Sequence, residues 1–158
     1  MCRIDYCEGE WVTLTDPHEV KARKEHKCSN CERAILPGER YHTGCWIDRE
    51  MDNAGVLVTV KYCAHCRVAA GWLQKVCGGF LWGDWQVTEE LDEHWEEEPQ
   101  FRCRSFAHLI AAMHKKWDGT TLSKAESLTR FATAHAVREI QAAADRGPAP
   151  HYVTRGGV

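Results

Sequence analysis

The chain has 158 residues, and its 20 lysines and arginines nearly balance 23 aspartates and glutamates. No apolar run approaches the ~20 residues that a bilayer-spanning helix needs. The net charge of −3 argues against a general nucleic-acid coat but allows a local basic patch. The first residues lack a signal-peptide pattern, so the nine cysteines predict reduced thiols in the cytoplasm, where metal binding is favoured over disulfides.

Taken in chain order, the sequence first predicts strands and then a helix. Residues 1–20 show no clear periodicity, and we expect them to wrap around the unit that follows. Residues 40–47 and 56–62 are rich in aromatic and β-branched side chains and are separated by turn-forming residues, which is typical of two antiparallel strands. Apolar side chains recur at helical spacing over 64–76, so the second strand is expected to lead into a helix.

The second half of the sequence predicts three further helices. Thr88 is expected to cap a short acidic helix with Trp95 on its buried side. Apolar residues three and four apart predict an amphipathic helix over 103–117. A capping-box sequence at 123–126 opens a last helix to about residue 145, and these two helices are expected to pair as a hairpin. The last helix should pack through the apolar residues Leu128, Phe131, Ala134, Val137 and Ile140.

Charge divides the chain into three blocks. Residues 1–83 are balanced, residues 84–98 carry eight carboxylates without a lysine or arginine, and residues 99–158 carry a net charge of +5. The acidic block is either a solvated linker or a docking surface. We therefore predict an α+β chain with four parts: a zinc-binding module (1–83), an acidic connecting segment (84–98), a helical hairpin (99–146) and a flexible tail (147–158).

Two pairs of cysteines predict a metal site. Two residues separate Cys28 from Cys31 and Cys63 from Cys66, and 31 residues separate the pairs. Each pair can form a turn that aims two thiolates at one point, and four thiolates form the tetrahedral shell that Zn²⁺ prefers. The order of turn, hairpin and helix is that of a treble-clef zinc module. Four protein ligands close the shell, so one structural zinc is expected. His26, His42, Cys45 and His65 lie nearby and are alternative ligands.

Six sequence segments, in order along the chain, carry a resemblance to known proteins. They are MCRID (1–5), ARKEHKC (22–28), I-x-PGERY (35–41), CAHC (63–66), CGGFLWG (77–83) and EHW-x-E (93–97). Together they resemble a family of small proteins encoded by phages and prophages. The resemblance covers about residues 1–119, implies a zinc-bound fold and a place in the host cytoplasm, and brings no catalytic residues. The helix after Thr120 departs from the family pattern.

These observations predict a non-enzymatic protein that binds and modulates a host or defence protein. Seven tryptophans exceed what a small core normally needs, and tryptophan is favoured as an interface anchor. The acidic segment alternates such anchors with carboxylates, so apolar contact would supply affinity while charge steers a basic partner. The predicted partner-binding residues are Trp82, Trp85, Trp95, Glu96, Glu97 and Glu98.

The alternative function is nucleic-acid binding. Lys21, Arg23, Lys24 and Lys27 lie directly before the first cysteine pair, where they could contact phosphates. The acidic segment argues against this function. A nuclease of the HNH type is less favoured still, because such an enzyme needs histidine and asparagine groups around a catalytic cation, and the chain has only two asparagines.

Overall fold

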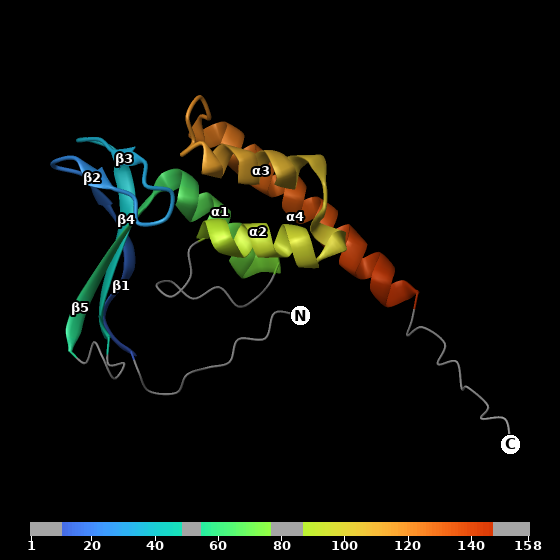
Figure 1. Ribbon diagram of the computed structural model, residues 1–158, viewed down its shortest axis with the longest axis horizontal. Helices are drawn as coiled ribbons and strands as arrows, with labels where there is room; N and C mark the ends of the chain where they lie inside the picture. Colours follow the sequence, from blue (N-terminus) through green and yellow to red (C-terminus); the bar gives the residue numbers. More distant parts are fainter. Residues whose placement is uncertain (1–10, 49–54, 77–86, 147–158) are drawn as a thin grey trace, which may run out of the picture.

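The computed structural model describes residues 11–48, 55–76 and 87–146, and in these ranges strands occupy one end of the molecule and helices the other (Figure 1). The strands are β1 (Trp11–Lys21), β2 (His26–Lys27), β3 (Ala34–Ile35), β4 (Arg40–Asp48) and β5 (Val56–Cys63). The helices are α1 (Ala64–Val76), α2 (Val87–Glu97), α3 (Arg104–His114) and α4 (Leu122–Asp145), with a short 3-10 turn, η1 (Pro99–Phe101), after α2. The predicted α+β class is confirmed.

Three of the strands form an antiparallel sheet in the order β1-β4-β5. The β4–β5 hairpin matches the two strands predicted from the sequence and pairs Tyr41 with Cys63 at one end. Because β5 passes directly into α1, Cys63 lies where the sheet meets the first helix. β2 and β3 form a separate two-stranded ribbon that pairs His26 with Ile35.

β1 differs from the expected aperiodic segment, because it pairs along most of β4. Its register shifts between Thr13 and Thr15 and again between Thr15 and His18. Such bulges break the period-two alternation by which a strand is recognised in a sequence. Pro17 lies inside the strand, which is tolerated at a sheet edge. A Cβ atom on Gly44 of β4 would come within 3.2 Å of the Pro17 ring, so glycine permits this close approach.

One hydrophobic core extends from the cysteine pairs to the helices. Trp72 of α1 is fully buried, and its ring stacks on Phe106 of α3 with 4.5 Å between centroids. Phe101 meets the same indole edge-on at 5.4 Å. The buried cluster continues to Cys28 on one side and to Ala125 of α4 on the other. None of the described helices is long and apolar enough to cross a membrane.

The core contact of α4 is made by small residues. Its buried side chains are Ala125, Ala132 and Ala136, which face α1 and α3. The predicted face of large residues is confirmed for Leu128, which is partly buried against the core, but is wrong for Phe131, Val137 and Ile140, which are 57%, 56% and 44% exposed. Alanine side chains let helix axes approach closely, so a stripe of alanines can pack where larger side chains would not fit.

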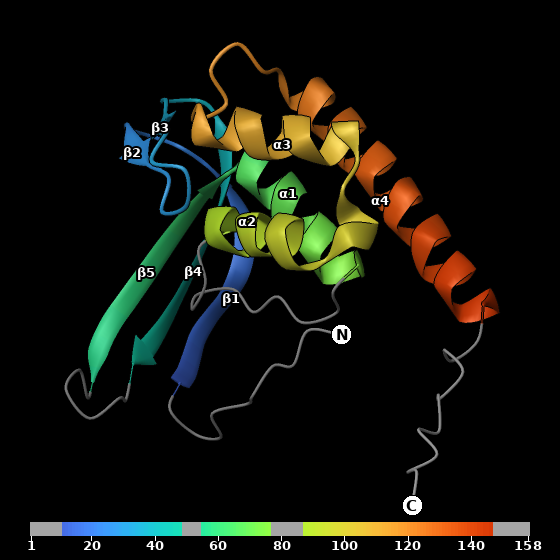
Figure 2. The same cartoon turned by 45° about the vertical axis from the view of Figure 1, so that its right-hand side comes forward.

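The far end of α4 projects from the rest of the molecule. No residue from 137 to 146 is buried, and both views show this end of the helix extending past α2 and α3 (Figures 1 and 2). The helix is 24 residues long and its last buried residue is Ala136, so only its first part is anchored in the core.

The ends of the helices differ from the expectation by a few residues. Thr88 lies within α2 and does not precede it. α4 is capped by the Thr121 hydroxyl, which accepts a hydrogen bond from the Lys124 amide at 3.3 Å. α3 ends at His114, so Trp117 lies beyond it in a loop with the backbone in the left-handed region, at a φ of 65°.

Candidate metal centre

Local structure brings the two cysteine pairs to one corner of the molecule. Cys28 follows β2, and its turn is closed by hydrogen bonds from the Cys28 amide to the Arg33 carbonyl (2.9 Å) and from the Glu32 amide to the Cys28 carbonyl (3.1 Å). Glu32 adopts a φ of 61°, which reverses the chain after Cys31. Cys63 is the last residue of β5 and Cys66 lies in the first turn of α1.

Two hydrogen bonds hold the first turn against the second pair. The Ser29 amide donates to the Lys61 carbonyl at 2.7 Å, and the Lys61 amide donates to the Ser29 hydroxyl at 3.0 Å. A third bond joins the Cys63 amide to the Cys28 sulfur at 3.3 Å. Three hydrogen bonds therefore hold the end of β5 and the turn after β2 together.

The four sulfur atoms form a compact cluster. All lie within 4.8 Å of one another, and the Sγ–Sγ distances are 3.8 Å for both Cys28–Cys66 and Cys31–Cys63. A tetrahedron with metal–sulfur bonds of about 2.3 Å has edges of about 3.8 Å, whereas a disulfide bond is about 2.05 Å long. All four side chains are at most 6% exposed. The residues present thus fit a metal ion bound by four thiolates.

The pKa values of the thiols in the cluster are shifted in opposite directions. Hydrogen bonds from Cys31, Cys63 and Cys66 lower the pKa of Cys28, despite its burial. Hydrogen bonds with Cys28 and the other thiols, followed by burial, raise the pKa of Cys66 well above its ordinary value. A metal that binds all four as thiolates must therefore displace protons, which makes metal affinity depend on pH.

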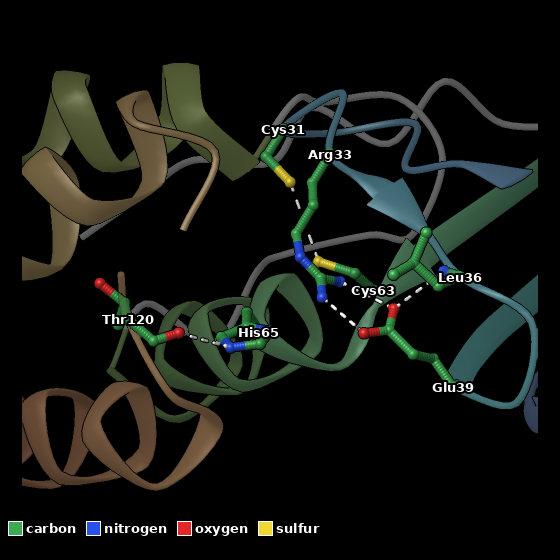
Figure 3. Close-up of polar contacts among 7 residues, drawn as sticks. All are labelled: Cys31, Arg33, Leu36, Glu39, Cys63, His65 and Thr120. Atoms are coloured by element: carbon green, nitrogen blue, oxygen red, sulfur yellow. Dashed lines mark hydrogen bonds and ion pairs between the residues drawn. The ribbon is translucent and has the colours of Figure 1, made fainter. Parts of the chain in front are cut away.

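Arg33 supplies positive charge beside the cluster (Figure 3). Its guanidinium forms a two-pronged ion pair with Glu39, at 2.6 and 3.1 Å, and the Leu36 amide donates to the same carboxylate at 3.1 Å. The hydrogen bond to Glu39 raises the pKa of Arg33, against the effect of burial, and the charges of Cys63 and Cys31 raise it further. Arg33 therefore partly offsets the negative charge of four thiolates.

The alternative ligands predicted from the sequence lie outside the cluster. Within the described ranges, the four cysteines are the only group of three or more potential ligands that lie close enough to share a metal ion. His26 lies with its Nδ1 atom 3.2 Å from the Lys61 amine, and the His65 Nε2 atom lies 3.0 Å from the Thr120 carbonyl oxygen. His42 and Cys45 are half-buried on β4.

The predicted partner-binding surface is described only in part. Trp82 and Trp85 lie outside the described residues. Trp95 is half-buried, with its ring 6.1 Å from that of Phe106. Glu96 and Glu97 are exposed, while Glu98 is half-buried and accepts a hydrogen bond from Gln100.

The predicted nucleic-acid contacts are all exposed around the start of the ribbon. They are Lys21, Arg23, Lys24 and Lys27. Lys27 forms an ion pair with Glu32 at 2.7 Å, and Lys116 approaches the other oxygen of that carboxylate at 3.0 Å. Hydrogen bonds from these two lysines lower the pKa of Glu32 to about 2. Part of the basic charge is therefore already matched within the chain.

Sequence reasoning missed two residues that contact this corner. The Asn30 side chain is buried, and its carbonyl oxygen accepts a hydrogen bond from the Val87 amide at 2.8 Å, which caps the start of α2. The indole of Trp117 donates to the Cys66 sulfur at 3.4 Å. These contacts span 57 and 51 residues, so no local pattern could reveal them.

No family model, curated protein or solved structure matches this chain. The assignment of the metal centre consequently rests on the four cysteines and their geometry.

Proposed function

We propose that the four cysteines bind one structural Zn²⁺ ion. Tetrahedral sites made only of sulfur suit zinc or iron, and four protein ligands leave no open position for a substrate or water. The zinc would hold the ribbon, the β5 end and the start of α1 together. Elemental analysis of protein purified without chelator should find one zinc per chain. Protein without zinc, or with iron and visible absorption, would overturn this assignment.

Given this metal site, we propose that the chain is a non-enzymatic interaction protein that binds a basic protein partner. The observation that carries the proposal is the outward face of α2. Glu89, Glu93, Glu96 and Glu97 are all exposed there, at spacings of four, seven and eight residues. None of these four carboxylates forms an ion pair with a described residue. We call these four residues the acidic ridge.

The acidic ridge destabilises its own helix. Like charges four residues apart repel on a helix, and Glu89–Glu93 and Glu93–Glu97 are both such pairs. Arg102, the nearest cation after α2, donates to the Trp95 carbonyl at 2.7 Å and to the Glu96 carbonyl, and not to the ridge carboxylates. A cationic partner would relieve this repulsion, and Trp82 and Trp85 remain its predicted apolar anchors. The resemblance to phage and prophage proteins supports a host or defence protein as that partner.

Charge reversal tests the interaction. The triple variant Glu93→Lys, Glu96→Lys, Glu97→Lys should lose a partner captured from host lysate, and association should weaken with salt for the unaltered protein. The matched control is Glu126→Lys, Glu139→Lys, Asp145→Lys, which changes the net charge equally but on α4. Equal capture by both variants would overturn the acidic ridge as the binding surface.

Nucleic-acid binding is the second candidate, favoured by the four exposed cations beside the first cysteine pair. Treatment of the same lysate with nuclease separates the candidates, because a protein partner survives it. Affinity for a labelled oligonucleotide that falls steeply with salt, and that falls again in Lys21→Ala, Lys24→Ala protein, would support the second function.

A further inference from the structure

The loop between α3 and α4 lies against the metal centre. We call residues 115–121 the capping loop. It contacts the residue that follows the first cysteine pair and also a cysteine of the second pair: the Lys116 amine lies 3.0 Å from the Glu32 carboxylate, and the Trp117 indole nitrogen lies 3.4 Å from the Cys66 sulfur. A third contact joins the Thr120 carbonyl oxygen to His65 at 3.0 Å (Figure 3). The loop is therefore attached to the cysteine corner at three points.

The backbone of the capping loop adopts an unfavourable conformation that contacts with neighbouring residues must stabilise. Lys116 and Trp117 have φ values of 54° and 65°, a backbone region that residues other than glycine rarely adopt. Two such residues in succession persist only where neighbouring structure fixes them. Trp117 is 3% exposed, and its ring lies 5.4 Å from that of His65.

The chemistry of the indole–sulfur contact depends on the state of Cys66. A thiol sulfur is a weak hydrogen-bond acceptor, whereas a charged acceptor makes a shorter and stronger bond. Cys66 is fully buried, so water does not compete with the indole N–H for its sulfur. Metal binding makes the sulfur a thiolate and so strengthens the bond from Trp117.

We propose that the capping loop belongs to the metal centre, with Trp117 as a positioning residue for Cys66, and that metal binding thereby positions the α3–α4 hairpin. This inference rests on the proposed metal site. Metal binding and the position of the hairpin are then linked. A metal that strengthens the contact between Trp117 and Cys66 is itself bound more tightly when that contact is present.

The test measures metal affinity and the metal–sulfur spectrum. Trp117→Phe keeps an aromatic ring and removes the N–H, so Co²⁺ affinity measured against a competing chelator should fall by about 10- to 100-fold, as found for outer contacts of metal ligands. The sulfur-to-cobalt charge-transfer band should shift as well. Trp72→Phe is the matched control, because Trp72 is equally buried but its indole N–H has no acceptor among the described residues. Trp72→Phe should leave the Co²⁺ affinity and the sulfur-to-cobalt charge-transfer band unchanged.

A second measurement uses the unaltered protein and so does not depend on folding of a variant. In ¹¹³Cd-loaded protein, a ¹H–¹¹³Cd correlation spectrum should show the Trp117 indole proton coupled to the metal through the Cys66 sulfur. Unaltered affinity and band in Trp117→Phe, or absence of this cross-peak, would overturn the inference. A protein that shows no charge-transfer band at all would instead overturn the metal site itself.

Discussion

The cysteine corner and the far end of α4 are built in opposite ways. At the corner, two cysteine pairs, the start of α2 and the capping loop meet, and each is joined to another by a hydrogen bond to a sulfur atom or a buried side chain. At the far end, the last nine residues of α4 and the Arg146 that follows them contain no buried side chain. The corner is thus held by contacts between distant segments, whereas the far end of α4 buries no side chain against them.

This difference indicates at which end of the molecule a substitution should disturb other segments of the chain. A residue at the corner contacts several segments of the chain, so its loss should disturb all of them. The far end of α4 is sustained mainly by its own helix propensity, to which Ala142, Ala143 and Ala144 contribute. A substitution there should remain local. The predictions that follow compare paired substitutions, and they run from the largest expected effect to the smallest.

Removal of a metal ligand should produce the largest effect. Structural zinc contributes on the order of 10 kcal/mol to folding in small zinc modules, so Cys66→Ser should lose the metal and unfold the corner. The control is Cys103→Ser, because Cys103 is a half-buried cysteine outside the cluster. Zinc content and the thermal unfolding midpoint check the pair. Cys66→Ser protein that is as stable as the control would show that the metal does not hold this corner.

Two phenylalanines test the core against the exposed face of α4. Phe106 is fully buried against Trp72, so Phe106→Ala should lower the free energy of unfolding by about 3–5 kcal/mol. Phe131 is mostly exposed on α4, and Phe131→Ala should change it by less than about 0.5 kcal/mol. Urea unfolding of zinc-saturated protein measures both. A large loss in Phe131→Ala would mean that the outer face of α4 is covered in solution.

Asn30 tests whether the first cysteine pair also organises α2. Asn30→Ala leaves the buried Val87 amide without its acceptor, which should cost about 1–3 kcal/mol of unfolding free energy. The neighbouring Ser29 is exposed, and water can replace its hydroxyl at the Lys61 amide, so Ser29→Ala should cost less. Chemical denaturation at fixed zinc concentration compares the two. Equal losses would indicate that α2 does not depend on this contact.

The sequence was informative wherever the signal was local. The β4–β5 hairpin, α1 and the four cysteines were all predicted, because strand composition, helical spacing and paired cysteines are each visible within about a dozen residues. β1 was missed because two register shifts and Pro17 remove its alternation. The contacts of Asn30 and Trp117 were missed because their partners are more than fifty residues away.

Apart from Leu128, the buried face of α4 was predicted wrongly, and for a different reason. Two stripes fit the helical period, one with Phe131 and Val137 and one with Ala132 and Ala136, and the larger residues suggested the core. Which stripe is buried depends on how closely α4 approaches α1, and that distance is not encoded in the helix alone. Trp117 likewise fits the spacing of α3, yet the positive φ of Lys116 ends that helix and turns the indole towards Cys66.

The start of α4 offers the smallest and most local test. The sequence pattern places the cap at Ser123, whereas the structure places it at Thr121, whose hydroxyl accepts from the Lys124 amide. Thr121→Ala should therefore cost about 1 kcal/mol of unfolding free energy. The Ser123 hydroxyl lies 3.1 Å from that of Thr121, so Ser123→Ala should cost only a few tenths of a kcal/mol.

Urea unfolding of the two alanine variants, at saturating zinc, measures this difference. A larger loss of unfolding free energy in Ser123→Ala than in Thr121→Ala would indicate that the helix begins two residues later and that the capping loop is correspondingly longer. Thr121 is the last residue of that loop and caps the first turn of α4. The same residue therefore links the cysteine corner to α4: the cap fixes where α4 begins, and the loop contacts fix where that beginning lies relative to the cysteines.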